Sequence, residues 1–507
     1  MASLSTPGAS DQYRLPTDVK PVHYDVTIKT DLENQIFEGF VRIDLDVKEA
    51  TSRIVLNTSD LDLGTAWLSS DSVKVDQVLS AQTFDKESER VSYELGITLP
   101  AGSKASLKVA FKGELTGSMM GYYKSTYEED GKTKYYALTQ FEPTAARRAF
   151  PCWDEPLLKA TFGVTLISRA DTTNLSNMPA VSEDVITPNT QAAKGDAGYE
   201  ALFAGLKDGE WKVTKFENTP PMSSYIVAFA NGHFKYLEDS VVLPLSGKTL
   251  PLRIYTTAEH IHQAQFALDV KKAVLPLYEK VFDVGYPLPK LDTLVASDFD
   301  AGAMENWGLI TGRTNAFLLD PKKADLQAKK QIASTQSHEV AHMWFGNITT
   351  MEWWNYLYLN EWFCYPDGRG HHRGVFPEWK VDSNFISEHL NRALNLDAKP
   401  SSHAIEVDCP DANHINQARG SSYFVLVSKL IKFKIFDSLS YSKAASVLRM
   451  LSNYVGEDRF LKGVSIYLKN KLYQNSVTTD LWDGISKATG IDIPKVMDNW
   501  VTKVEIE

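Results

Sequence analysis

The most constraining feature of this chain is a pair of histidines at helical spacing with acids nearby. His338 and His342 are four residues apart in His338-Glu-Val-Ala-His342, so on a helix both imidazoles lie on one face. Glu361 follows in Leu359-Asn-Glu361. Three protein ligands with a fourth position left for water are typical of a catalytic zinc ion. The spacing therefore predicts a single Zn²⁺ held by His338, His342 and Glu361.

Glu339, directly after the first histidine, is the candidate general base. A zinc ion lowers the pKa of a water at its open position towards about 7, and a nearby carboxylate can take the released proton. From its place beside the histidine face, Glu339 reaches such a water. The short motif alone leaves open an ordinary helix with two unrelated surface histidines, and the flanking segments argue against that alternative.

Four flanking segments carry a family resemblance. They are Gly302-Ala-Met-Glu-Asn306, the proline-rich and aromatic stretch 139–156, the start at 14–24, and 440–450. With the histidine motif and Glu361, these segments resemble the zinc aminopeptidases of the aminopeptidase N and puromycin-sensitive type, the gluzincin aminopeptidases. The resemblance implies an N-terminal β domain, a thermolysin-like catalytic domain, and peptides with a free N-terminal amine as substrates.

The resemblance also implies a role for each matching residue. It assigns zinc to the histidines and Glu361, and makes the acid of the motif the general base. Glu305 would bind the α-amine of the substrate, with Gln140 and Glu142 beside it, and the backbone at Ala303 would lie along the peptide. Tyr441 would donate to the oxyanion. Carboxylates that pair with an ammonium would distinguish the end of a peptide from its middle.

Each of these assignments has a simpler alternative if the residues are taken singly. Glu142 and Glu305 would be solvated surface acids, because most acids are exposed. Tyr441 would be a core aromatic, since it shares a helical stripe with three apolar residues further along. The other members of that stripe are Ala445, Leu448 and Leu451.

Length and patterning predict an α+β protein of two domains, because 507 residues exceed what one core usually serves. Period-two alternation over 13–230 predicts an antiparallel β domain. Helical spacing dominates 231–500, the expected thermolysin-like and mostly helical catalytic domain, with short β segments near 251–256 and 293–297. Pro276 should kink or end the helix in which it lies. Residues 1–12 and 501–507 are expected to be tails.

Composition excludes several classes of function. The net charge of −11 argues against a nucleic-acid partner. The N-terminus lacks the basic start and apolar core of a signal peptide, and no apolar run is long enough to span a membrane. Three cysteines, Cys152, Cys364 and Cys409, give no disulfide framework. We therefore expect a cytoplasmic protein with no membrane partner.

The chain departs from the family pattern at three places. Residues 362–374 replace a helix with a stretch rich in glycine, 418–434 look inserted, and the chain ends at Glu507 without the C-terminal β-sandwich and helical domains of relatives. We expect either gene-model artefacts or a diverged surface loop. Relatives tend to carry acids where Gly368 and Tyr356 stand, and such acids orient metal-binding histidines.

Two rival functions remain open beside the aminopeptidase. The departures above suit a catalytically impaired, truncated product or pseudoenzyme. A bifunctional epoxide hydrolase of the leukotriene-A hydrolase type shares the zinc site and the amine-binding segment. That group usually has glycine in place of Ala303, which disfavours it.

Overall fold

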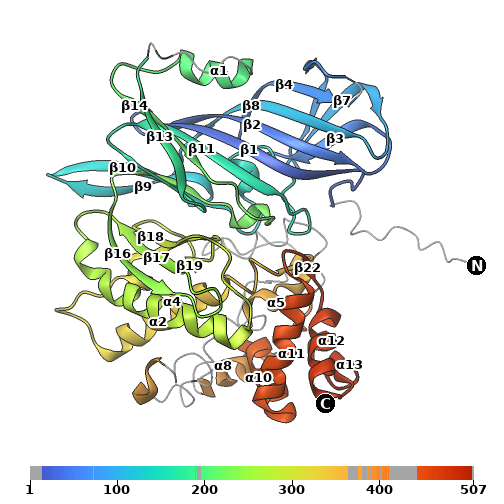
Figure 1. Cartoon of the computed structure of the whole chain (residues 1–507), viewed down its shortest axis with the longest axis vertical. Helices are drawn as coiled ribbons and strands as arrows, with labels where there is room; N and C mark the ends of the chain where they lie inside the picture. Colours follow the sequence, from blue (N-terminus) through green and yellow to red (C-terminus); the bar gives the residue numbers. More distant parts are fainter. Residues whose placement is uncertain are drawn as a thin grey trace, which may run out of the picture.

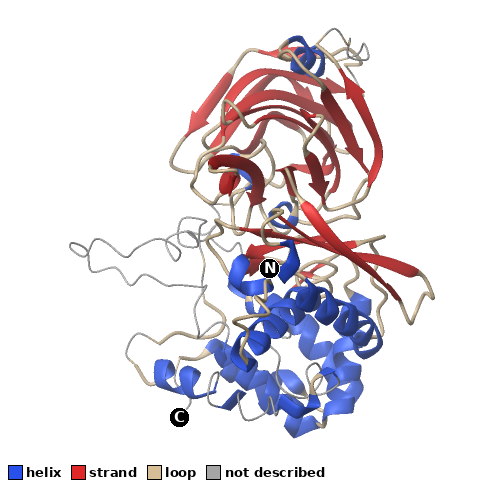
Figure 2. Cartoon of the chain, turned by 90° about the vertical axis from the view of Figure 1, so that its left-hand side faces the viewer, coloured by secondary structure: helices blue, strands red, loops and turns tan. Residues whose placement is uncertain are grey.

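A computed structural model of the chain describes residues 14–71, 73–188, 190, 196–362, 375–379, 385–386, 390–399, 402–407, 409 and 442–504. The first half forms β-sheets, drawn at the top of Figure 1, and the second half is a smaller sheet with helices packed beneath it. Figure 2 shows this segregation of strands from helices from the side. The predicted α+β architecture, a β domain followed by a helix-rich one, is confirmed.

The largest sheet has eight strands, and its alternating pattern follows the predicted one. Tyr24, Val26 and Ile28 of the first strand are buried in the core, because successive side chains point to opposite faces. One pairing differs from the antiparallel prediction, since the first strand runs parallel to β11. Alternation fixes which face is buried but not the direction of the neighbouring strand. The strands in order across the sheet are β13 (Ala180–Ile186), β14 (Trp211–Phe216), β11 (Thr161–Arg169), β1 (Val19–Asp31), β2 (Ile36–Val47), β8 (Lys104–Glu114), β4 (Asp62–Ser70) and β5 (Gln77–Leu79).

Two smaller sheets complete the β domain. The last strand of these sheets, β15, ends at Gly232, and the next strand, which begins at Lys235, belongs to a different sheet. One sheet contains β12 (Thr173–Ser176), β15 (Phe229–Gly232), β10 (Lys132–Gln140) and β9 (Gly121–Glu129), and the other β3 (Thr51–Asn57), β7 (Arg90–Leu99) and β6 (Gln82–Asp85). The helical turns among them are η2 (Ala146–Arg148), α1 (Ala197–Ala204) and η3 (Ser224–Ile226).

A mixed five-stranded sheet opens the second domain. The β segments predicted near 251–256 and 293–297 correspond to its second and third strands. Its edge strand has only two residues, which places the segment with Glu305 at the rim of the sheet. Across the sheet the order is β16 (Lys235–Val242), β17 (Thr249–Thr256), β18 (Leu291–Ala296), β20 (Leu309–Arg313) and β19 (Ala303–Met304).

Helices cover this sheet and fill the rest of the domain (Figure 1). The first group comprises η4 (Ile261–Gln263), α2 (Gln265–Phe282), α3 (Thr314–Phe317), α4 (Leu326–Ala341), η5 (Trp354–Tyr356) and α5 (Tyr358–Glu361). The second comprises η6 (Pro377–Trp379), α8 (Asn391–Asp397), α10 (Ala444–Val455), α11 (Glu457–Asn470), α12 (Thr478–Thr489) and α13 (Ile493–Thr502). A short parallel pair, β21 (Thr350–Met351) and β22 (Asn475–Ser476), joins the two groups.

The sequence predicts that Pro276 kinks or ends its helix, and helix α2 contradicts the second of these two outcomes. The helix continues to Phe282 with Pro276 inside. A proline removes one hydrogen bond and clashes with the preceding turn, at a cost of about 3 kcal/mol. Burial of one face outweighs that cost, because Val274, Leu275, Tyr278 and Phe282 are all at most 1% exposed and such packing supplies most helical stability.

Several sequence predictions fall on residues without a described structure. Residues 1–13, 363–374 and 418–434 lie outside the described residues, as do Tyr441 and Cys364. At the other end, Val501 and Thr502 of the predicted tail belong to helix α13. Among the residues that the structure does describe, no helix is both long enough and apolar enough to cross a lipid bilayer.

A buried lysine side chain connects secondary structure elements of the second domain through hydrogen bonds. Lys271 of α2 is fully buried, and its Nζ donates to Arg253 O at 3.1 Å and to Leu291 O at 3.3 Å. It thereby ties the helix to β17 and to the start of β18. Burial lowers the pKa of Lys271 from 10.5 to about 7, because the charged form loses its hydration.

This lowered pKa predicts a pH-dependent stability. Above pH 7 folded Lys271 loses its proton, while the unfolded chain keeps it until about pH 10.5, so stability rises with pH in that window. We expect Lys271→Met to flatten the rise of the thermal midpoint between about pH 7 and about pH 9.5. Lys323→Met, at a highly exposed side chain, is the control, and equal slopes in all three proteins would contradict the assignment.

Candidate active site

The two histidines of the motif lie at the end of helix α4. Asp325 caps the start of this helix by accepting from Ala328 N at 2.7 Å, which satisfies one of the free amides of the first turn. His342 is the C-terminal cap, and its N donates to His338 O at 3.2 Å. The helical geometry predicted for the pair therefore holds up to its last residue, and both imidazoles face the same way.

The structure brings Glu361 to these imidazoles from helix α5. His338 Nε2 and His342 Nε2 are 3.0 Å apart, and Glu361 Oε2 lies 3.5 and 3.6 Å from them. Within the described part of the chain, this is the group of potential ligand atoms close enough to share one metal ion. Ligand atoms about 2.1 Å from a tetrahedral zinc ion lie about 3.4 Å from one another. The three residues thus fit the ion that the sequence predicts.

A backbone carbonyl orients His342. Its Nδ1 donates to Phe345 O at 2.9 Å, because a carbonyl oxygen can only accept. The proton then resides on Nδ1, which leaves Nε2 free to ligate a metal. The sequence suggested that orienting acids were missing at Tyr356 and Gly368. For His342 the carbonyl of Phe345 performs this task, and Gly368 lies outside the described residues.

Glu339 lies beside the cluster and is almost completely buried. Its side chain is 4% exposed, and its Oε2 has no hydrogen-bond partner among the residues that the structure describes. Burial raises its pKa well above the usual range, and the carboxylates of Glu305, Glu361 and Glu142 raise it further, whereas His342 opposes them. A buried carboxylate one residue from a histidine of the cluster is placed to act as a general base.

The other acids show opposite shifts. Burial raises the pKa of Glu305, and the charge of Glu361 adds to the effect. Burial would also raise the pKa of Glu361, but His342 and His338 outweigh it and hold the pKa below its usual range. Glu361 is therefore ionised, as a metal ligand must be.

The Gly-Ala-Met-Glu-Asn segment lies at the rim of the five-stranded sheet. Ala303 pairs with Gly312 of β20, and β19 is the last strand in the order, so its other edge has no strand partner among the described residues. Glu305 follows directly, with Oε1 3.9 Å from His342 Nδ1. Its own carbonyl accepts from Asn347 Nδ2 at 2.9 Å. The predicted peptide-binding backbone and the amine-binding acid are thus brought to the metal site.

Gln140 and Glu142 come from the end of strand β10 in the β domain. Gln140 Nε2 donates to Glu142 O at 3.3 Å, and both side chains are buried. Glu142 lies within electrostatic reach of the catalytic domain, since its charge raises the pKa of Glu339. The site is therefore composite, with groups from both domains. The predicted oxyanion donor, Tyr441, lies outside the described residues, although α10 begins just after it.

Reasoning from sequence missed the residues that support these groups. Tyr225 and Asn360 are buried beside the ligands, and Gly346 occupies the turn after His342 with a φ of +110°. For Gly346 the glycine itself is a signal in the sequence, because backbone with a positive φ favours glycine. Tyr225 has none, since it lies in an apolar run that reads as core.

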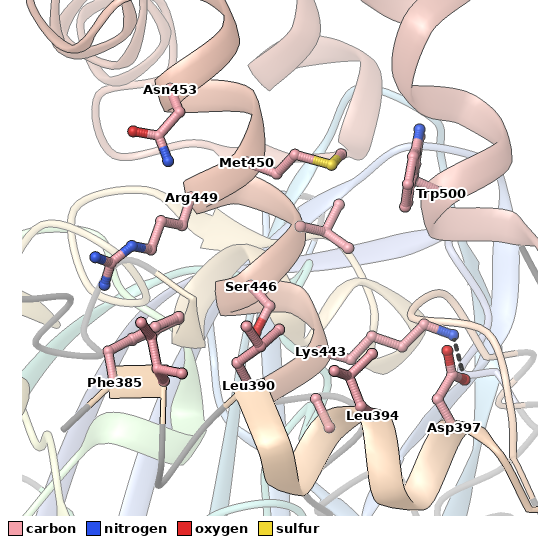
Figure 3. A pocket seen from close by; sticks show the side chains of 13 residues that line it. Phe385, Leu390, Leu394, Asp397, Lys443, Ser446, Arg449, Met450, Asn453 and Trp500 are labelled. Carbon is pink, nitrogen blue, oxygen red and sulfur yellow. Dashed lines mark hydrogen bonds and ion pairs between the residues drawn. The ribbon is translucent and has the colours of Figure 1, made fainter. Parts of the chain in front are cut away.

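A separate apolar cavity of about 550 Å³ lies between α8, α10 and α13 (Figure 3). Leu394, Met450 and Trp500 line it, and Lys443 pairs with Asp397 at 2.7 Å on one side. Of the predicted site residues with a described structure, none lines this cavity.

Comparison with known proteins agrees with this geometry. The profile of the peptidase M1 N-terminal domain matches residues 20–194, and that of the peptidase family M1 domain matches 266–500. Aminopeptidase 2, mitochondrial, of Saccharomyces cerevisiae is 40% identical over 97% of this chain and 47% of its own length. Aminopeptidase M1 of Arabidopsis thaliana is 38% identical over 96% of this chain and 50% of its own.

A third relative gives the same picture. The puromycin-sensitive aminopeptidase of Caenorhabditis elegans is 36% identical over 99% of this chain and 49% of its own length. The chain thus spans about half the length of the curated relatives it matches. Both domain profiles match in the same order in which the two domains were found, and the zinc ligand set lies within the second match. The chain belongs to peptidase family M1, the family of zinc metallo-aminopeptidases.

Proposed function

We propose that this chain removes N-terminal residues from peptides by zinc-dependent hydrolysis. The observation that carries the proposal is the convergence of His338, His342 and Glu361 with an adjacent buried Glu339. A purely structural zinc site would have four protein ligands, and only these three group together in the described part of the chain. These three relatives are all named as aminopeptidases, which favours the same activity.

The residues of the site divide the chemical work. His338, His342 and Glu361 would hold the ion. When bound, zinc supplies a Lewis acid that polarises the scissile carbonyl and acidifies water. Glu339 takes the proton of the attacking water and delivers it to the leaving amine.

Recognition of the peptide end falls to the buried acids beside the metal site. A substrate ammonium that pairs with Glu305 and Glu142 relieves the repulsion between these carboxylates and the others. The outer edge of β19 at Ala303 can hydrogen-bond an extended substrate, as a sheet edge binds an added strand. Together these contacts fix the register, so that only the first peptide bond reaches the reacting groups. Tyr441 as the oxyanion donor rests on the resemblance alone.

The first test removes the base but keeps the ligands. We expect Glu339→Gln to retain zinc while turnover of an aminoacyl arylamide falls by about 10²- to 10⁴-fold. Glu361→Gln should lose zinc as well as turnover, because it removes a ligand. Metal analysis of the purified proteins together with the rate assay separates the two effects.

Three outcomes of this test have different meanings. Turnover by Glu339→Gln at the wild-type rate would contradict the assignment of Glu339 as the general base. A wild-type chain with a full complement of zinc and no turnover would favour the rival, a catalytically impaired product. An exposed acid nearby, Glu352, provides the control, since Glu352→Gln should leave both zinc and turnover unchanged.

The second test concerns the free amine of the substrate. We expect N-acetylation of a peptide to lower kcat/KM by about 10- to 100-fold or more, because a charge-assisted hydrogen bond is worth about 1.5–3 kcal/mol. Glu305→Gln should reduce the preference for the free amine, mainly through a higher KM for the unblocked peptide. Equal hydrolysis of blocked and unblocked peptides would overturn the roles of Glu305 and Glu142.

A further inference from the structure

A tyrosine of the β domain enters the catalytic domain beside the metal ligands. Tyr225 lies in η3 and is 1% exposed. Its hydroxyl donates to Gly346 O at 3.1 Å and accepts from Asn360 Nδ2 at 3.0 Å. Both partners belong to the catalytic domain, and each adjoins a segment that carries a metal ligand. The phenol therefore links two ligand segments that are otherwise separate in the chain.

The first segment is the short helix that presents Glu361. Helix α5 has four residues, fewer than an isolated helix needs to be stable. Asn360 directly precedes the ligand Glu361, and both ends of its side-chain amide hold the helix in place. Its Oδ1 accepts from Met351 N at 3.1 Å, and its Nδ2 donates to the Tyr225 hydroxyl. The position of Glu361 thus depends on a side chain whose donor end is fixed by the β domain.

The second segment is the turn after His342. Gly346 O accepts from Tyr225 and also from Thr350 Oγ1 at 2.5 Å. A Cβ at Gly346 would lie 3.4 Å from Glu305 Oε1 and 3.5 Å from both Asn360 Nδ2 and His342 Nδ1. This glycine therefore sits between the amine-binding acid, the Glu361 segment and the second histidine. The preceding carbonyl, that of Phe345, orients His342.

The neighbouring carbonyls of the same turn are held from the β domain as well. Lys159 Nζ donates to Asn347 O and Ile348 O at 3.3 Å, and to Gln474 O at 3.2 Å. These bonds keep the turn from following small motions of helix α4. Lys159 holds the turn at Asn347 and Ile348. Loss or movement of the Tyr225 hydroxyl would therefore mainly shift the part of the turn that is next to the metal ligands.

The phenol is a donor with a fixed partner and takes no part in proton transfer. Burial raises the pKa of Tyr225 well above its usual value, and the charges of Glu305, Glu142 and Glu361 raise it further, although the hydrogen bond from Asn360 opposes them. The hydroxyl thus stays protonated at any working pH. Because its proton is directed at Gly346 O, it orients neighbouring groups and does not reach the substrate.

We propose that Tyr225 is a positioning residue of the metal centre, through which the β domain sets Glu361 by way of Asn360 and His342 by way of the turn at Gly346. The inference rests on the proposed function of the same site. It adds a requirement for metal binding that cannot be recognised from the ligand residues alone. Metal affinity in this chain depends on how the two domains are docked. The residue lies outside the ligand motif, more than a hundred positions earlier in the chain.

The test removes one oxygen atom. Tyr225→Phe keeps the ring, including its edge contact with Trp354 at a centroid distance of 5.5 Å, and loses only the hydroxyl. We expect the zinc dissociation constant to rise by about 10- to 100-fold, the usual effect of losing an orienting contact behind a ligand. The measurement is a titration of the metal-free protein with zinc in competition with a chelating dye.

A matched control separates positioning from general stability. Tyr122 is another buried tyrosine of the β domain, and its hydroxyl hydrogen-bonds Thr30 Oγ1 at 2.8 Å, away from the metal centre. Tyr122→Phe should lower the thermal midpoint of the metal-free protein about as much as Tyr225→Phe does, yet leave zinc affinity unchanged. With zinc at saturation, Tyr225→Phe should also reduce kcat more than it changes KM for an unblocked peptide.

A second variant keeps the test decisive if Tyr225→Phe folds poorly. Asn360→Ala removes the intermediate group, and it should weaken zinc binding itself. In the double variant the two losses of zinc affinity should be less than additive, since both substitutions break the same hydrogen bond, that between Asn360 and Tyr225. Unchanged zinc affinity in both single variants, or full additivity, would overturn the positioning role. If the wild-type chain binds zinc and cleaves peptides while Tyr225→Phe matches it, only this inference fails; if the wild type binds no zinc, the proposed function fails with it.

Discussion

Burial of several negative charges in one place is the constraint on which this structure depends. Glu305, Glu339 and Glu361 are each 4% exposed and Glu142 is 6% exposed. An unpaired buried carboxylate costs several kcal/mol, and like charges raise that cost. The two imidazoles offset only part of this cost. They hold the pKa of Glu361 below its usual range, whereas the pKa of Glu305 stays raised. A cation at the site would offset this cost, and His338, His342 and Glu361 lie close enough together to hold a metal ion.

A site of this kind needs a scaffold that resists mutual repulsion, and the chain supplies it by drawing on separate elements. The potential metal ligands come from α4 and α5, Glu305 follows β19, and Glu142 follows β10. The interface between the domains is rich in side-chain bonds to main-chain carbonyls, such as those from Asn177 to Trp307 O at 2.9 Å and from Lys290 to Ser176 O at 2.7 Å. Such bonds fix position and direction together, which apolar packing alone does not.

Much of the fold followed from local patterns, and the exceptions have physical causes. Alternation located the strands with Tyr24 and Val41, but it carries no information about strand direction, so the parallel pairing of β1 with β11 was missed. The expectation that Pro276 could end its helix was wrong because local helix propensity takes no account of the buried face of α2.

The sequence by itself indicated the ligand set, because His338 and His342 are spaced to share one helix face and Glu361 follows as a third acid, and the family resemblance supplied Glu305 and Glu142. Only the tertiary structure decided what holds these residues in place. The contacts of Tyr225, Asn360 and Gly346 join segments far apart along the chain, and in sequence they look like an apolar run, a polar neighbour and a turn. A chemical motif is local, whereas the positions of its atoms are set by long-range contacts that no local pattern records.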